Sequence, residues 1–251
     1  MLIWKRIGRP IFRCGLPVAA PNYRSRTNIP DPRPKPAFRP TQARVGRRAC
    51  RALIQLARFQ EDNTLEPQDH RKRLKMDLPF LPVNIALLTV SDSRDLDNDR
   101  SGDTLEKMIT EDGHRIVRRE VRKDEVSLIQ AFLEDCIADS AVDVVITTGG
   151  TGVTGRDVTP EAFKGVMEKE IEGFGELFRW ISFAKIGTST MQSRALGGVA
   201  NGTYLFALPG SPGACKDGWG EILRWQLKYR HMPCNLVDLM PRLNEHLQSA
   251  G

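Results

Sequence analysis

Apolar residues recur along the chain in two patterns, which predict alternating strands and helices. Short runs of β-branched residues, such as Val144-Val145-Ile146, are typical of strands buried on both faces of a parallel sheet. Between these runs, apolar residues fall at helical spacing. Strands are expected at residues 83–90, 116–121, 144–146, 193–199 and 203–208, and helices at 102–111, 125–137, 160–168, 171–184, 214–229 and 235–247. The pattern predicts an α/β fold, a three-layer α/β/α sandwich with a mainly parallel sheet, and Asn201-Gly202 predicts one antiparallel hairpin.

Small polar residues mark the expected helix starts. Ser101 is the candidate N-cap of helix 102–111, and Asp124 is the candidate N-cap of helix 125–137. Thr159-Pro160-Glu161 combines a candidate N-cap with proline at the first helical position. The helix at 171–184 carries so many aromatic residues that we expect it to form core or a subunit interface.

Residues 1–75 differ in composition from residues 76–251, which we expect to form one α/β domain. The front segment carries 18 Lys/Arg against 5 Asp/Glu, and prolines recur at every second position from 30 to 36. It could be a disordered basic arm for nucleic acid or anionic lipid, an organelle transit peptide, or sequence upstream of a true start at Met76. We favour the last interpretation, and expect a protein starting at Met76 to fold with an unchanged melting temperature and oligomer size.

Charge and cysteine content narrow the function classes. Beyond residue 75 the chain carries 19 basic and 26 acidic residues, so the formal charge of +6 comes from the front segment. The α/β domain is therefore not predicted to bind nucleic acid, and such a function would rest on residues 1–75 alone. Five cysteines without C-x-x-C spacing fit a reducing, cytoplasmic location. No apolar run is long enough to predict a membrane span.

Two glycine-rich loops follow predicted strands. Thr147-Thr148-Gly149-Gly150-Thr151-Gly152 comes after the strand at 144–146, and Pro209-Gly210-Ser211-Pro212-Gly213 comes after the strand at 203–208. Glycine lets the backbone approach a ligand closely, and free N–H groups at a strand end bind anions. Because such loops meet at one edge of a parallel sheet, a ligand that spans them should carry phosphate. A glycine-rich turn without a ligand is the alternative.

Acidic and hydroxyl residues accompany the loops. Asp124 and Asp157 follow the ends of strands, and two carboxylates near phosphate indicate Mg²⁺. Ser91-Asp92-Ser93 closes the first strand, either as ligand contacts or as a polar turn. No cysteine–histidine pair or serine–histidine–aspartate set accompanies these residues, and neither acid has an obvious structural partner in the sequence.

Several motifs in order resemble the molybdenum cofactor biosynthesis proteins of the MoaB/MogA family, over residues of about 84–235. They are Thr-Val-Ser-Asp-Ser at 89–93, Asp-Arg-Ser-Gly-Asp at 99–103, the loop and Gly-Arg-Asp-Val-Thr-Pro-Glu-Ala at 147–162, Glu-Gly-Phe-Gly-Glu at 172–176, Gly-Thr-Ser-Thr-Met-Gln-Ser-Arg at 187–194 and Leu-Pro-Gly-Ser-Pro at 208–212. The block at 172–194 resembles the MoaB branch more than the MogA branch.

The resemblance implies a molybdopterin-binding protein with the MogA-like fold, and for catalytic members a transfer of AMP from Mg-ATP to the terminal phosphate of molybdopterin with release of pyrophosphate. Carried over by motif, the catalytic and Mg²⁺-binding residues are Asp124 of Lys-Asp-Glu at 123–125 and Asp157 of Gly-Arg-Asp-Val-Thr-Pro. The molybdopterin-binding residues are Thr89, Ser91, Asp92, Ser93, Thr148, Gly149, Gly150, Thr151, Gly152, Thr159, Pro160 and Glu161, and the nucleotide-binding residues are Pro209, Gly210, Ser211 and Pro212. A non-catalytic molybdopterin-binding or scaffold protein of the same pathway is the alternative. Relatives of this family also imply a homo-trimer or hexamer, and other proteins of the pathway are possible partners.

Overall fold

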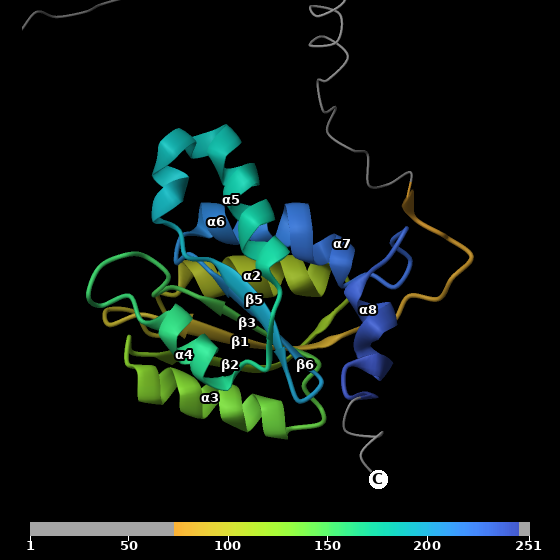
Figure 1. Cartoon of the computed structure of the whole chain (residues 1–251), viewed down its shortest axis with the longest axis horizontal. Helices are drawn as coiled ribbons and strands as arrows, with labels where there is room; N and C mark the ends of the chain where they lie inside the picture. The colour runs from red at the N-terminus through yellow and green to blue at the C-terminus, as the bar shows by residue number, and fades with distance from the viewer. Residues whose placement is uncertain (1–72, 246–251) are drawn as a thin grey trace, which may run out of the picture. The chain divides into compact units, whose positions relative to one another are not determined.

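The computed structural model describes residues 73–245, and within them one six-stranded sheet organises the chain (Figure 1). Predictions for residues 1–72 and 246–251 lie outside the described residues. The strand order is β2-β1-β3-β6-β5-β4. The strands are β1 (Asn84–Val90), β2 (Arg115–Arg122), β3 (Val144–Thr148), β4 (Lys169–Glu170), β5 (Leu196–Ala200) and β6 (Thr203–Leu208).

The sheet is mainly parallel, as the sequence predicts. Strand β1 pairs in parallel with β2 and β3, and β3 pairs in parallel with β6. Strands β5 and β6 form the predicted antiparallel hairpin, whose turn residues Asn201 and Gly202 both adopt positive φ. The parallel arrangement places the carboxyl ends of β1, β3 and β6 at one edge.

Helices cover both faces of the sheet and confirm the three-layer architecture. Helices α3 and α4 lie on one face, and α2, α5, α6 and α7 lie on the other (Figure 1). The helical elements are α2 (Arg100–Glu111), α3 (Val126–Ala138), α4 (Thr159–Val166), α5 (Glu172–Ile186), η2 (Gly187–Gln192), α6 (Pro212–Asp217), η3 (Gly218–Leu223), α7 (Arg224–Gln226), α8 (Leu236–Leu239) and η4 (Met240–Arg242).

Alternate residues of the central strands pack into two separate hydrophobic cores. Ile85 and Leu87 of β1 pack in the core under α2, α5 and α6, while Ala86 and Leu88 pack in the core under α3 and α4. Both cores exclude water from the strands, so every residue of β3 and β6 is buried. This explains why apolar residues dominate both strands.

Several helix starts differ from the prediction. Asp99, not Ser101, caps α2, because its carboxylate accepts the N–H of Gly102. Asp124 does not cap α3, which starts after Glu125 without a side-chain cap. Thr159 is the first residue of α4 rather than its N-cap, and its hydroxyl donates to the carbonyl of Gly149 instead.

The boundaries of other elements also differ from the prediction. The predicted strand at 193–199 begins only at Leu196, and the helix predicted at 214–229 begins at Pro212, where Ser211 caps it. The helix predicted at 235–247 is the short α8 followed by η4 as far as the described residues extend, because Pro241, two residues after the end of α8, cannot continue an α-helix. Strand β4 was not predicted, because its two residues, Lys169 and Glu170, are exposed and charged.

Residues 73–75 belong to the folded part. The N–H of Lys75 donates to the carbonyl of Arg230 at 3.0 Å, and the N–H of Met232 donates to the carbonyl of Arg73 at 3.0 Å. Leu74 lies between these bonds and forms an antiparallel bridge with His231. Among the described residues no helix has the length and apolar character to cross a membrane.

Candidate functional site

The two glycine-rich loops meet at the carboxyl edge of the sheet. The hydroxyl of Thr148 donates to the carbonyl of Pro209 at 3.0 Å, and the N–H of Gly149 donates to the carbonyl of Leu208 at 3.0 Å. A Cβ on Gly210 would lie 3.0 Å from the Cα of Gly149, so the two backbones touch. The convergence predicted from the sequence is therefore present.

Glycine is required at two positions of the first loop. Gly149 has a φ of +109°, and a Cβ there would lie 2.1 Å from the carbonyl oxygen of Val90. Gly150 has a φ of +61°, and a Cβ there would lie 2.5 Å from Oδ1 of Asp124. The loop thus folds back against β1 and against an acidic side chain, in a conformation that other residues rarely adopt.

A cavity of about 750 Å³ opens where the loops meet. Many of the predicted site residues line it. They are Ser91, Ser93, Asp124, Gly149, Gly150, Thr151, Gly152, Asp157, Pro209, Gly210 and Ser211. The N–H groups of Gly150, Thr151 and Ser211 donate to no other residue in the range 73–245. They are available to a ligand with acceptor oxygens.

The remaining predicted residues lie around this lining. Thr89 is buried and donates to Asp99 at 2.7 Å, and Asp92 pairs with Arg156. The hydroxyl of Thr148 donates to the second glycine loop at Pro209, and that of Thr159 donates to the first at Gly149. Pro160 and Pro212 are first-turn residues of α4 and α6. Glu161 forms an ion pair with Arg194.

The two acids of the cavity have different surroundings. The carboxylate of Asp124 accepts no hydrogen bond and forms no ion pair with any residue in the described range, and burial, with the nearby charges of Asp92 and Asp157, raises its pKa. Partial burial also acts on Asp157, but donors outweigh it and lower its pKa. The N–H and hydroxyl of Thr154 donate to Asp157 Oδ2 at 2.8 and 2.6 Å. The sequence had suggested that neither acid has a structural partner; Asp157 has one.

These two acids fit a magnesium ion. Mg²⁺ is usually held by one or two carboxylates together with phosphate oxygens and water. Asp124 and Asp157 supply two carboxylates that interact electrostatically across one cavity. No group of three or more metal-ligating side chains exists in residues 73–245, so an ion here would depend on a bound phosphate for further ligands.

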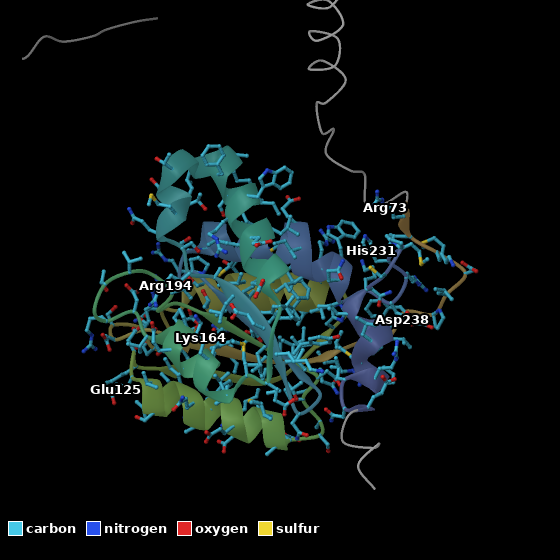
Figure 2. All side chains as sticks on the ribbon, viewed as in Figure 1. Arg73, Glu125, Lys164, Arg194, His231 and Asp238 are labelled. Carbon is cyan, nitrogen blue, oxygen red and sulfur yellow. The ribbon has the colours of Figure 1, made fainter. Side chains whose placement is uncertain are left out.

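Arg194 clamps the loop that carries Asp157. Its backbone N–H donates to the carbonyl of Thr151 at 2.9 Å, and its guanidinium donates to the carbonyls of Gly152 and Asp157 at 2.6 and 2.7 Å. Figure 2 shows Arg194 on the side of the molecule where the loop after β3 lies. The motif at 187–194 thus ends in a residue that shapes the glycine loop, a role that its sequence spacing could not reveal.

Another part of the cavity lining comes from elements that the sequence did not connect with a ligand. Phe178, Ser182 and Lys185 of α5 line it, together with residues of η2. Lys185 also pairs with Asp217 of α6 at 2.5 Å, which ties the two helices together. Arg94 and Arg156 are further lining residues that the sequence analysis missed.

The sequence of this chain is similar to those of known molybdenum cofactor biosynthesis proteins. Residues 86–229 match the family model described as "Probable molybdopterin binding domain". The chain is 47% identical over 156 residues to molybdenum cofactor biosynthesis protein B of Escherichia coli, which covers 62% of this chain and 92% of the relative. It is 40% identical over 152 residues to the protein of that name from Staphylococcus epidermidis, with 59% of this chain and 86% of the relative covered.

Solved structures of proteins with these names also superpose on this chain. A crystal structure of molybdenum cofactor biosynthesis protein B superposes with a TM-score of 0.61 at 37% identity, covering 67% of this chain and 99% of the other. The tungsten cofactor synthesizing protein MoaB from Pyrococcus furiosus superposes with a TM-score of 0.51 at 30% identity, covering 69% and 99%. With the family model spanning more than half of its residues, this chain belongs to the MoaB/MogA family of molybdopterin-binding domains.

Proposed function

We propose that this protein acts in molybdenum cofactor biosynthesis in the cytoplasm and adenylylates molybdopterin at the expense of Mg-ATP. The observation that carries the proposal is a single cavity shared by both glycine loops and both acids. In the reaction, the terminal phosphate of molybdopterin attacks the α-phosphate of ATP. A P–O–P bond to AMP forms, the bond to the β-phosphate breaks, and pyrophosphate leaves.

The chain's own residues would mainly position the reactants. Free N–H groups of Gly150 and Thr151 would hold the phosphate of molybdopterin, and the loop at 209–212 would hold the nucleotide. Two phosphate groups brought together repel each other, so the site must offset their charge. Asp124 and Asp157 would hold Mg²⁺, which supplies positive charge to the phosphates when bound.

Asp124 is better suited than Asp157 to bind the Mg²⁺ that arrives with ATP. Its carboxylate accepts no hydrogen bond from the described residues, and burial together with the charges of Asp92 and Asp157 raises its pKa, although the charge of Arg156 acts in the opposite direction. Groups whose pKa is shifted by burial and by specific neighbouring charges cluster at functional sites. Asp157 is held by Thr154 and Arg194 at its loop and so supplies a fixed second carboxylate.

An assay of product formation tests this proposal. Purified protein, ATP, Mg²⁺ and molybdopterin should yield adenylylated molybdopterin and pyrophosphate in equal amounts. Neither product should form when molybdopterin or Mg²⁺ is left out. Tight binding of molybdopterin without consumption of ATP would instead support the alternative, a non-catalytic molybdopterin-binding or scaffold protein.

The proposal includes a closed homo-oligomer, a trimer or hexamer. One side of α5 is buried in the core, while Leu177, Trp180, Phe183 and Ile186 leave large apolar surfaces exposed on the other, and Trp180 is 62% exposed. Symmetric association would cover such a surface. Light scattering at micromolar concentration should give a multiple of the chain mass, and Trp180→Glu should reduce it. A monomer mass for the unaltered protein would refute this part of the proposal.

A further inference from the structure

Four cations line the cavity, and they differ in how their charge is balanced. Arg156 pairs with Asp92, and Lys185 pairs with Asp217. Arg94 and Lys216 form no ion pair with any residue from 73 to 245, and Lys216 stands exposed on α6. Arg94 is therefore the half-buried cation of the cavity lining whose charge meets no carboxylate.

Arg94 is held in place by neutral acceptors. Its Nη1 donates to the hydroxyl of Ser101 at 3.0 Å and to the carbonyl of Gly210 at 3.3 Å. Ser101 is fully buried and donates to the same carbonyl at 3.0 Å. The three residues form a triangle that joins the loop after β1, the start of α2 and the second glycine loop. This arrangement orders the guanidinium without neutralising it.

Part of the guanidinium remains available to a ligand. Nε and Nη2 of Arg94 donate to no residue in the described range, and neither is a buried atom without a partner, so both reach open space. An arginine with a fixed position, unpaired charge and free donors in a cavity matches the forked geometry of phosphate oxygens.

The triangle also orients the backbone of the second glycine loop. In a trans peptide the carbonyl and the following N–H point in opposite directions. Fixing the carbonyl of Gly210 on Arg94 and Ser101 therefore turns the N–H of Ser211 away from the buried Ser101. That N–H makes no hydrogen bond within residues 73–245, and Ser211 lines the cavity. Arg94 thus combines a direct donor with control over a second one.

We infer that Arg94 binds a phosphate group of the nucleotide and, with Ser101, positions the Gly210–Ser211 peptide as a second donor to it. This inference rests on the proposed function and adds a nucleotide-phosphate subsite to it. Phosphate could also reach Arg94 from molybdopterin. The anchor on Gly210 favours the nucleotide, because that glycine belongs to the loop on the proposed nucleotide side.

Titration calorimetry on the full chain tests the inference, with ATP and molybdopterin as separate ligands in the presence of Mg²⁺. Arg94→Gln should weaken ATP binding by about 10- to 100-fold, the usual effect of losing a charged hydrogen bond. Arg94→Lys, which keeps the charge but not the fork, should fall between this variant and the unaltered protein. Ser101→Ala should weaken ATP binding by a smaller factor. Molybdopterin affinity should stay unchanged in all three.

Arg100→Gln is the matched control, because Arg100 is an exposed arginine at the start of α2 that does not line the cavity. It should bind ATP like the unaltered protein, and it removes the same net charge. Equal losses in Arg94→Gln and Arg100→Gln would reduce the effect to general electrostatics and overturn the inference. Loss of molybdopterin affinity alone in Arg94→Gln would overturn the assignment to the nucleotide.

The test separates the inference from the proposed function. If the unaltered protein binds ATP and adenylylates molybdopterin while Arg94→Gln binds ATP equally well, only the inference fails. If the unaltered protein binds molybdopterin but no ATP, adenylylation and the subsite fail together. Melting temperatures of the variants show whether each remains folded. If Arg94→Gln does not remain folded, Arg94→Lys takes its place in the comparison.

Discussion

Replacing each acid of the cavity by asparagine should change the stability of the ligand-free protein in opposite directions. Asp157→Asn removes a carboxylate that accepts two hydrogen bonds from Thr154, at 2.8 and 2.6 Å. Asp124→Asn removes a carboxylate that accepts none from the described residues. Although the sequence presents the two acids alike, the structure predicts that Asp157 stabilises the ligand-free protein and that Asp124 destabilises it.

The expected magnitudes are small but measurable. Charge-assisted hydrogen bonds are roughly twice as strong as neutral ones, and solvent screens the exposed loop, so Asp157→Asn should lower the free energy of unfolding by about 1 kcal/mol. Asp124→Asn removes a partly buried charge that accepts no hydrogen bond and lies near two other carboxylates, and it should raise the free energy of unfolding by up to about 1 kcal/mol. Each change corresponds to a shift in Tm of roughly 2–4 °C for a domain of this size.

Acid should remove both effects on stability. The pKa of Asp157 is lowered, so its contribution is present above the unfolded value of 3.8 and is lost as the pH falls through the folded value. The pKa of Asp124 is raised, so its penalty is present at neutral pH and disappears as the pH falls through the folded value toward 3.8. Both differences from the unaltered protein should be seen at pH 7 and should shrink in acid.

Urea unfolding of the ligand-free proteins at pH 7 provides the assay. The effect of Asp124→Asn should also be smaller in an Asp157→Asn background, because Asp157 contributes to the raised pKa of Asp124. Equal shifts of the same sign for both single variants would refute the reasoning, since the acids would then share one environment.

Three further predictions concern the support of the fold. Burial lowers the pKa of His114 to about 4, and its Nδ1 accepts the N–H of Val83, so between pH 6.5 and 4 only the unfolded state gains a proton and stability should fall by up to about 3 kcal/mol. Urea unfolding at pH 7 and 4.5 should show this loss, and His114→Asn should reduce it. Arg194→Met removes the side-chain clamp on the glycine loop and should cost about 1–3 kcal/mol in urea unfolding, whereas Glu161→Gln, which removes only an exposed ion pair, should cost less than about 1 kcal/mol; equal costs would contradict the clamp. Removing residues 1–72 should leave the melting temperature unchanged, whereas starting at Met76 also removes the bonds of Arg73 and Lys75 to residues 230–232 and should lower it by a few degrees.

The strands could be predicted from the sequence because burial on both faces leaves a strong local signal. Runs such as Val144-Val145-Ile146 contain only apolar residues, and the structure buries all of them. Strand β4 leaves no such signal, since Lys169 and Glu170 are exposed. Capping residues were hard to assign because Asp99, Ser101 and Asp124 are all plausible caps, and only tertiary contacts decide which side chain is free to bond the backbone.

The site could be predicted where its residues follow strands, and not where they come from distant elements. The glycine loops and both acids were identified because strand ends of a parallel sheet share one edge. Arg94 and Arg194 were missed because their partners, Gly210 and Gly152, lie far away in sequence. Thr154 lies three residues from Asp157, but only the turn that brings its hydroxyl to the carboxylate reveals the contact.

Single-turnover adenylylation shows whether this protein transfers AMP and whether Asp124 and Asp157 take part. Molybdopterin and saturating Mg-ATP would be mixed with the unaltered protein, Asp124→Asn or Asp157→Asn, and adenylylated molybdopterin would be followed with time. We expect product with the unaltered protein and rates lower by orders of magnitude in both variants, whose molybdopterin affinity should persist through the loop N–H groups. Equal rates in all three proteins would remove Asp124 and Asp157 from the mechanism, and no product in any of them would contradict adenylylation itself.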